Sequence, residues 1–356
     1  MKKTIDGKAL VYADRAFTTP NGKTAHGLVR FTERYEIIGL IDHMFAGKDA
    51  GEVLDGKPSN IPIFADLQSA INDLILEDEK ITLVMGLAPD GGRLPVEAKN
   101  TIKMALQYGM NIDSGLHDFL YKDDDLMAVA KENGCRVRDI RRTPDRDQLH
   151  FFTGKIEEVD CLKIAVLGTD SAIGKRTTAW IIVHALRAAG VTAEMVGTGQ
   201  TAWMQGAKYS MIMDSCINDF VSGEIEHAVY QAWKNETPDV ILIEGQGSLM
   251  NPAYPGGFEI LAAGRPDFVI LQHAPRRLEY DGFPGYKLHS IEEQIAAIET
   301  ISHKKVLAVT INHENMGKEE VQEECDRITK EIGLVTVDVL HAGADQIVNF
   351  IKSQLK

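Results

Sequence analysis

The sequence feature that most constrains the fold is an apolar strand that runs into a glycine-bounded loop and then a helix, at residues 163–178. Residues 164–167 form an apolar run of the kind buried in parallel sheets. Gly168 and Gly174 allow the backbone to wrap around an anion, and Lys175 adds a positive charge that faces it. The helix that follows directs its free N–H groups at the same point. The stretch therefore predicts a phosphate-binding loop, with the expected binding residues Gly168, Thr169, Asp170, Ser171, Ala172, Ile173, Gly174, Lys175, Arg176, Thr177 and Thr178.

This loop departs from the usual phosphate-binding loop in two ways. Five residues separate its glycines, where about four are usual. Arg176 stands where the Ser or Thr that binds Mg²⁺ should follow the lysine, so Thr177 or Thr178 would have to replace that ligand. Gly168 taken alone also fits an ordinary strand-to-helix turn, and the prediction rests on the whole cluster.

A second motif, at residues 239–248, supports the first. It contains an apolar strand that ends in Glu244, which is the form of a Walker B element beside a phosphate-binding loop. Glu244 is a candidate to coordinate Mg²⁺ through water, to orient a nucleophile or to act as general base. The alternative interpretation is a turn or helix-capping acid. Asn312 follows a later strand, at a place where many nucleotide-binding folds read the base.

The length of the chain predicts two domains, because 356 residues exceed the size at which one hydrophobic core keeps growing. Strands and helices alternate in both halves, which predicts an α/β protein. We expect a Rossmann-like domain at residues 1–150 and a P-loop domain with a doubly wound, mainly parallel sheet at residues 151–356. The boundary is expected between Thr143 and Asp160, in a charged, proline-containing stretch.

The N-terminal half carries two candidate ligand-binding positions. Asp42 ends an expected strand at residues 36–41, where an acid can hold a ribose hydroxyl, but no G-x-G-x-x-G turn precedes it. Otherwise Asp42 caps the next turn, and residues 47–60 are expected to form a loop. Arg93, at residues 86–95, is a candidate to pair with a substrate carboxylate, or else a solvated loop arginine.

In the C-terminal half, residues 197–206 predict a polar, glycine-rich loop at a strand end, suited to contact a substrate. Trp203 in this loop either shares that contact or fills the core. Asp219 is a candidate N-cap for the helix that follows. The candidate substrate-binding residues are Arg93, Thr198, Gln200, Thr201, Gln246 and Arg276.

Charge and cysteine content limit the classes of partner and compartment. A net charge of −14 argues against binding to nucleic acid or to anionic membranes. The four cysteines lack metal-ligand spacing and no secretory leader is recognisable, so reduced thiols in a cytoplasmic protein are expected. The apolar runs are too short to span a bilayer. The expected partner is a small molecule.

Taken together, these motifs resemble the D-glutamate N-acetyltransferase-like family, long known only as a domain of unknown function. The resemblance covers nearly the whole chain and rests on residues 86–95, 115–117, 168–178, 197–201, 219–223 and 244–248. It implies a Rossmann-like domain followed by a P-loop domain similar to dethiobiotin synthetase. It also implies transfer of an acetyl group from acetyl-CoA to the amine of a small acidic amino acid, with D-glutamate expected, in a homo-oligomer.

Under the hypothesis of acetyl transfer, each group of motif residues would have its own role. Lys175, Arg176 and the loop N–H groups would hold the phosphates of CoA, and Glu244 or Asp170 would take a proton from the substrate ammonium. Backbone N–H groups near Gly245 or Gly199 would stabilise the oxyanion. Arginines would hold the glutamate carboxylates, the candidates being Arg93, Arg142 and Arg276.

Two other functions stay open at this point. An ATP-dependent ligase or kinase would place Mg²⁺-ATP in the same loop, with Thr177 and Glu244 as the metal-binding residues, and would activate a small carboxylate. A nucleotide-gated binding protein without chemistry would leave the polar residues at 197–206 unexplained. Having Arg176 in place of a hydroxyl favours acetyl transfer, because it weakens the usual Mg²⁺ site.

Overall fold

The computed structural model describes residues 4–74 and 80–355, which form two compact units. The first unit comprises the chain up to Thr143 together with Gln200–Gly206, and the second comprises Pro144–Gly199 and Ala207–Lys356. The division predicted from the sequence is continuous in the chain, whereas these units are not. The short segment at residues 200–206 packs with the N-terminal unit although both its neighbours in sequence belong to the other unit.

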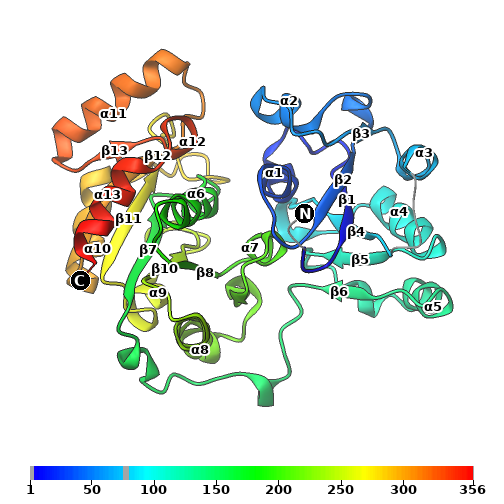
Figure 1. Cartoon of the computed structure of the whole chain (residues 1–356), viewed down its shortest axis with the longest axis horizontal. Coiled ribbons are helices and arrows are strands. Elements are labelled where there is room, and N and C mark those ends of the chain that lie inside the picture. Colours follow the sequence, from blue (N-terminus) through cyan, green and yellow to red (C-terminus); the bar gives the residue numbers. More distant parts are fainter. Residues whose placement is uncertain (1–3, 75–79, 356) are drawn as a thin grey trace. The chain divides into compact units, whose positions relative to one another are not determined.

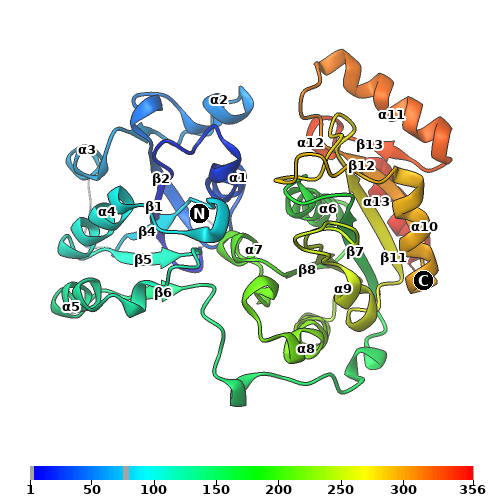
Figure 2. The same ribbon diagram turned by 180° about the vertical axis from the view of Figure 1, so that it is seen from behind.

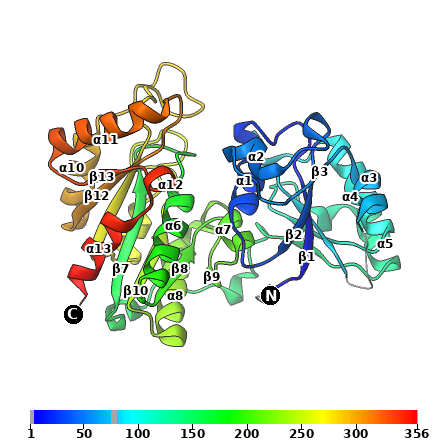
Figure 3. The same ribbon diagram turned by 45° about the horizontal axis from the view of Figure 1, so that its top comes forward.

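The N-terminal unit is built on a six-stranded, all-parallel sheet with the strand order β3-β2-β1-β4-β5-β6. This is the strand order of Rossmann folds. The strands are β1 (Lys8–Tyr12), β2 (Glu36–Ile41), β3 (Ile63–Phe64), β4 (Thr82–Met85), β5 (Asn111–Ser114) and β6 (Val137–Asp139). Helices α1 (Lys23–Arg30), α2 (Ala50–Asp55) and α7 (Gln200–Gln205) pack on one face, and α3 (Leu67–Asp73), α4 (Val96–Gln107) and α5 (Asp124–Glu132) on the other (Figure 3). The Rossmann-like prediction is confirmed.

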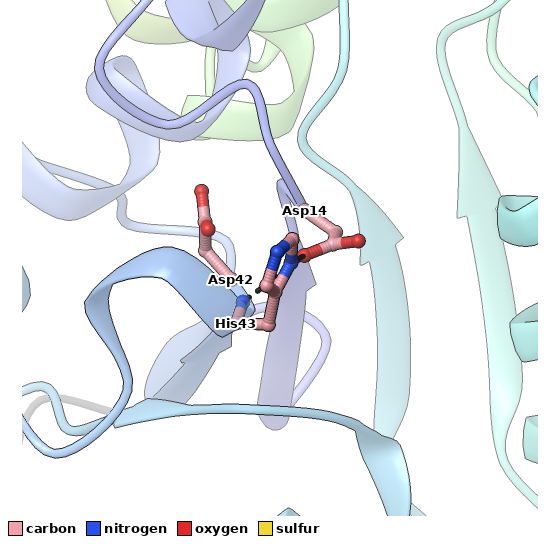
Figure 4. Close-up of side chains that lie close together, drawn as sticks. All are labelled: Asp14, Asp42 and His43. Atoms are coloured by element: carbon pink, nitrogen blue, oxygen red, sulfur yellow. Dashed lines mark hydrogen bonds and ion pairs between the residues drawn. The ribbon is translucent and has the colours of Figure 1, made fainter.

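Asp42, at the end of β2, ties the loop after β1 to the next turn. Its carboxylate is fully buried and accepts hydrogen bonds from the backbone N–H groups of Phe17 at 3.2 Å and Met44 at 3.0 Å. It therefore caps the 3₁₀ turn at His43–Phe45, one of the two roles expected. Asp14, Asp42 and His43 lie close enough to share a metal ion, but His43 Nδ1 is already 2.6 Å from Asp14 Oδ1 (Figure 4). Hydrogen bonds account for this cluster.

A buried ion pair joins β5 to β6 in the same unit. The Asp113 carboxylate is fully buried, and Arg138 donates to it through Nε at 2.7 Å and through a second guanidinium nitrogen at 2.5 Å. Tyr35 donates its hydroxyl at 2.6 Å to the same carboxylate. Arg138 and Arg34 also lie over the Trp203 ring of α7, at 4.7 and 3.6 Å from its centre. Trp203 thus fixes α7 to this unit.

Replacing Arg138 by methionine is expected to lower the free energy of unfolding of the N-terminal unit by about 3 kcal/mol, because the buried Asp113 carboxylate loses both of its hydrogen bonds from a guanidinium. The measurement is urea denaturation followed by circular dichroism. Arg136→Met is the control, since its guanidinium lies 3.9 Å from Asp113 and its side chain is 43% exposed. Equal losses for the two variants would show that the Arg138 pair has no special weight.

The C-terminal unit is built on a seven-stranded, all-parallel sheet with the order β13-β12-β11-β7-β10-β8-β9. Its strands are β7 (Leu162–Gly168), β8 (Ala193–Gly197), β9 (Tyr209–Ser210), β10 (Val240–Glu244), β11 (Phe268–His273), β12 (Lys305–Ile311) and β13 (Thr336–Val337). Helices α8 (Asn218–Glu236), α9 (Phe258–Ala263), α10 (Ile291–Ser302) and α11 (Lys318–Ile332) cover one face. Helices α6 (Lys175–Ala188), α12 (Val339–Ala342) and α13 (Asp345–Gln354) cover the other (Figures 1 and 2). The doubly wound prediction is confirmed.

Three local predictions are wrong. Residues 47–60 contain helix α2, whose N-cap Asp49 accepts from the backbone N–H of Glu52 at 3.0 Å. Residues 197–206 are a helix for most of their length, because α7 lies in the N-terminal core. Asp219 does not cap α8, which begins one residue earlier at Asn218. Across residues 4–74 and 80–355, no helix combines the length and apolarity needed to cross a membrane.

Candidate phosphate-binding and acid–base site

The phosphate-binding loop lies at the carboxyl end of β7, in the middle of the C-terminal sheet. Strands β10 and β11 flank β7, and their registers place Glu244 beside Val166 and Gln272 beside Gly168. Ligands of open parallel sheets bind at these carboxyl ends. The sheet order therefore brings the two sequence motifs to one edge.

Lys175, the first residue of α6, folds back over the loop. Its Nζ donates to the carbonyl oxygen of Asp170 at 2.6 Å and to that of Gly247 at 2.7 Å. A Cβ on Gly168 would lie 2.8 Å from the Lys175 Cδ, so only glycine leaves room for the lysine stem. Gly174 has φ +101°, which turns the loop into the 14-residue helix α6. The lysine, the turn and the helix start form a cradle for an anion.

Asp170 is a structural anchor of the loop. Its carboxylate is fully buried and accepts from Arg277 at 2.9 Å, from the backbone N–H of Asp281 at 2.9 Å and from Asn251 at 2.9 Å. Arg277 also donates twice to Glu314, both at 2.8 Å. Burial opposes its charge, but hydrogen bonds to Glu314 and Asp170 hold the pKa of Arg277 above its ordinary value. Both oxygens of Asp170 are therefore engaged.

Glu244 lies in a different environment at the end of β10. It is 4% exposed, and its Oε2 accepts from the backbone N–H groups of Thr198 at 2.8 Å and Gly199 at 3.1 Å. Burial raises the pKa of the Glu244 carboxyl above its ordinary value, although the charge of Arg176 and these N–H groups act in the opposite direction. A buried carboxyl with a raised pKa is suited to accept a proton.

The structure brings some predicted site residues together. Gln246 donates to the Thr198 hydroxyl at 3.0 Å, and the same hydroxyl donates to the Glu244 backbone oxygen at 3.0 Å. Asn312 donates to the carbonyl oxygen of Ile173 at 3.2 Å, inside the phosphate-binding loop. Thr198, Glu244, Gln246 and the loop thus form one site in the C-terminal unit.

Other predicted residues lie elsewhere. Arg93 is exposed in the N-terminal unit, where Gln200 and Thr201 are buried in α7 and the Thr201 hydroxyl lies 3.0 Å from that of Thr24. In the C-terminal unit, Arg276 pairs with the exposed Glu320 at 3.1 Å. Thr177 is half-buried in the first turn of α6.

Sequence reasoning missed three residues of the site. Arg277, and not its neighbour Arg276, reaches Asp170, and nothing in a pair of adjacent arginines distinguishes them. Gln272 accepts from the hydroxyls of Thr178 and Thr310, each at 2.5 Å, so Thr178 faces the sheet. Asn251 joins the loop after β10 to Asp170. Gln272 was detectable as a polar residue directly after the apolar residues of β11.

Comparison with known proteins places both units in one family. Residues 150–348 match the P-loop domain, and residues 43–143 the Rossmann-like domain, of a family described as a domain of unknown function, DUF1611. A DUF1611 family protein from Anabaena variabilis has a crystal structure that matches with a TM-score of 0.88 at 27% identity, covering 98% of this chain and 99% of that one.

Two curated relatives carry an enzyme name, "D-glutamate N-acetyltransferase". The relative from Tritonibacter scottomollicae is 30% identical over 327 residues, which cover 88% of this chain and 96% of the relative. The relative from a Pseudoalteromonas species is 31% identical over 273 residues, which cover 75% and 80% respectively. The chain belongs to the DUF1611 family and is similar over most of its length to two proteins named D-glutamate N-acetyltransferase, as its sequence motifs predicted.

Proposed function

We propose that this chain is an N-acetyltransferase that acetylates the amine of a small acidic amino acid, D-glutamate, with acetyl-CoA as the acetyl donor. The observation that carries the proposal is Glu244, a buried carboxyl with a raised pKa close to Lys175 and Arg176. The names of the two curated relatives support it. The site combines a proton acceptor with an anion cradle.

The cradle suits the phosphates of CoA. Coenzyme A is an adenine nucleotide with a pyrophosphate and a ribose phosphate, and a loop followed by a helix N-terminus binds such groups. Lys175 would exchange the carbonyl oxygens of Asp170 and Gly247 for phosphate oxygens, and Arg176 would add a second positive charge. This role needs no metal ion.

Glu244 would take the proton from the substrate ammonium. One N–H bond breaks, one O–H bond forms on the carboxylate, and the freed amine attacks the thioester carbonyl carbon. The C–S bond then breaks, the attacking nitrogen loses a second proton to become the amide nitrogen, and the departing CoA sulfur takes up that proton as a thiol. Transfer between two opposite charges leaves two neutral groups, which a buried site favours. Asp170 is unsuited to this role because Arg277 and two further donors hold its oxygens.

The backbone N–H group of Gly199 already donates a hydrogen bond to Glu244, so it does not serve to stabilise the oxyanion. That leaves the backbone near Gly245 as the candidate oxyanion donor. Arg176 stands where the Mg²⁺-binding hydroxyl is expected, which weakens the case for an ATP-dependent ligase.

The test is mass spectrometry of products after incubation with D-glutamate or L-glutamate, each given acetyl-CoA or Mg²⁺-ATP. We expect N-acetyl-D-glutamate from acetyl-CoA alone. Lys175→Ala should weaken the apparent affinity for acetyl-CoA at least about 10-fold, because it removes a charged hydrogen bond to phosphate. Lys330→Ala, on the exposed side of α11, is the control. Product or ADP that appears only with Mg²⁺-ATP would make the chain a ligase or kinase and overturn the proposal.

A further inference from the structure

The segment that follows β10 concentrates buried polar atoms that lack partners. Among the described residues, the Ser248 hydroxyl, the Tyr254 hydroxyl and the Oε2 atom of Glu259 are buried without a hydrogen-bond partner. These three atoms come from twelve consecutive residues, between β10 and the first turn of α9 (Figure 2). Unpartnered buried polar atoms are rare because each one costs free energy, so these three atoms are available to hydrogen-bond a bound group.

Tyr254 is held firmly beside the phosphate-binding loop. Its backbone N–H donates to the Asn251 side-chain oxygen at 3.0 Å, and the amide of the same asparagine donates to Asp170 at 2.9 Å. Gly247 has φ +49°, and a Cβ there would lie 2.1 Å from the Tyr254 carbonyl oxygen and 3.0 Å from its ring. Tyr254 therefore packs directly against Gly247, whose carbonyl oxygen accepts a hydrogen bond from Lys175.

Acidic groups make the largest electrostatic contributions at the Tyr254 hydroxyl. Burial raises the pKa of this hydroxyl, and the carboxylates of Asp214, Glu259 and Glu244 raise it further, as does Cys216. Burial also raises the pKa of the Cys216 thiol to about 11, so this thiol is neutral near pH 7. Tyr254 consequently stays protonated in a field set by carboxylates. An oxyanion would be repelled there, whereas a cation would be attracted.

We propose that Tyr254 is the residue that positions the primary ammonium of the substrate, with its hydroxyl oxygen accepting an N–H bond and with Glu259 supplying opposite charge. This inference rests on the proposed function and adds the recognition of the amine. Glu244 is one of the acidic groups that act on the Tyr254 hydroxyl, so an ammonium held at Tyr254 lies near the proton acceptor. After the proton passes from nitrogen to Glu244, the neutral amine still has N–H bonds to donate to Tyr254.

Two substitutions test the proposal kinetically. Tyr254→Phe removes one oxygen atom, and Glu259→Gln removes one charge at nearly constant shape. Each substitution should raise the KM for D-glutamate about 10-fold or more, because it removes a hydrogen bond or ion pair to a charged group. The KM for acetyl-CoA should stay within about 2-fold of the wild-type value. Tyr230→Phe is the matched control, since the Tyr230 hydroxyl, at the surface of α8, donates a hydrogen bond to the Glu158 carboxylate at 3.3 Å. Thermal melting by circular dichroism checks that each variant is folded.

Calorimetry separates amine recognition from catalysis. The probes are D-glutamate and D-2-hydroxyglutarate, which differ only in the amine. Wild type should bind the amine compound at least about 10-fold more tightly, and Tyr254→Phe should remove most of that preference. A folded Tyr254→Phe variant with unchanged KM and preference would overturn the assignment while acetyl transfer stands. Amine preference without any transfer from acetyl-CoA would overturn the proposed function and leave the Tyr254 assignment in place.

Discussion

Replacing Glu244 by glutamine is expected to lower the rate of acetyl transfer by about 10²–10⁴-fold, because the amide cannot accept the substrate proton. The side-chain oxygen of glutamine still accepts the N–H bonds of Thr198 and Gly199, which lie 2.8 and 3.1 Å from the carboxylate. The loop geometry should therefore persist. Glu319→Gln, on the exposed side of α11, is the control for loss of one charge.

The same substitution has an unusual expectation for stability. Burial raises the pKa of Glu244 in the folded protein, so folding favours its neutral form. A carboxyl whose pKa is raised in the folded state contributes most to the free energy of unfolding below its unfolded-state pKa, about 4.3. This contribution is lost as the pH rises through the folded-state pKa. The Glu244→Gln variant does not lose this stability as the pH rises, because glutamine does not ionise.

At pH 7–8 the variant should thus unfold with a free energy equal to or above that of wild type, and the difference should vanish near pH 4. The measurement is urea denaturation at both pH values. In addition, the rate of acetyl transfer by wild type should be measured against pH, and its decline on the acid side should occur at a pH above the ordinary range of carboxyl pKa values. An active, destabilised variant would assign Glu244 a structural role.

Replacing Arg277 by methionine is expected to cause the largest loss of stability in the C-terminal unit, about 3–5 kcal/mol. Arg277 donates to Asp170, to the backbone oxygen of Ser171 and twice to Glu314. Asp170 is fully buried, so methionine would leave an uncompensated carboxylate inside the phosphate-binding loop. The expected functional result is weaker acetyl-CoA binding, because Asp170 shapes the loop that carries Lys175.

The adjacent arginine supplies the control. Arg276 is 47% exposed and pairs with Glu320, which is 51% exposed, so Arg276→Met should cost at most about 1 kcal/mol. Adding Asp170→Asn to Arg277→Met should recover part of the lost stability, because the unpaired charge is then gone. Thermal and urea denaturation of the four proteins is the measurement. Similar costs for the two arginines, or no recovery in the double variant, would contradict the buried-pair account.

The central part of the fold was predictable because its physical signals are local. An apolar run, a glycine that turns the chain and a charged residue after it specify β7, the loop and α6, and β10 has the same kind of signal in its run of apolar residues ending in Glu244. Parallel sheets place the carboxyl ends of their strands at one edge, so the proximity of these two motifs was also predictable. Helix α10 was detectable too, since Ser290 and Glu293 form a capping box that the sequence reading overlooked.

The remaining features depend on contacts between residues far apart in the chain. Local polarity predicted a loop for residues 197–206, but their burial against α1 makes most of them a helix. The choice of Arg277 over Arg276 as the partner of Asp170 depends on the direction in which the chain leaves β11. Tyr254 shows no motif at all, and its surroundings are set by residues between Asp214 and Glu259. Such assignments require three-dimensional contacts.

Helix α7 has a consequence for the order in which the protein can be completed during synthesis. Met204 is fully buried in the core beneath α1 and α2, and Gln205 donates to the carbonyl oxygens of Gly27 at 2.8 Å and Phe31 at 3.0 Å. These groups reach the ribosomal exit only after β7, α6 and β8 have been made. The core of the N-terminal unit therefore stays incomplete, with part of its apolar interior exposed to water, until more than half of the polypeptide has emerged. A nascent chain arrested before residue 206 would expose apolar surface that chaperones bind.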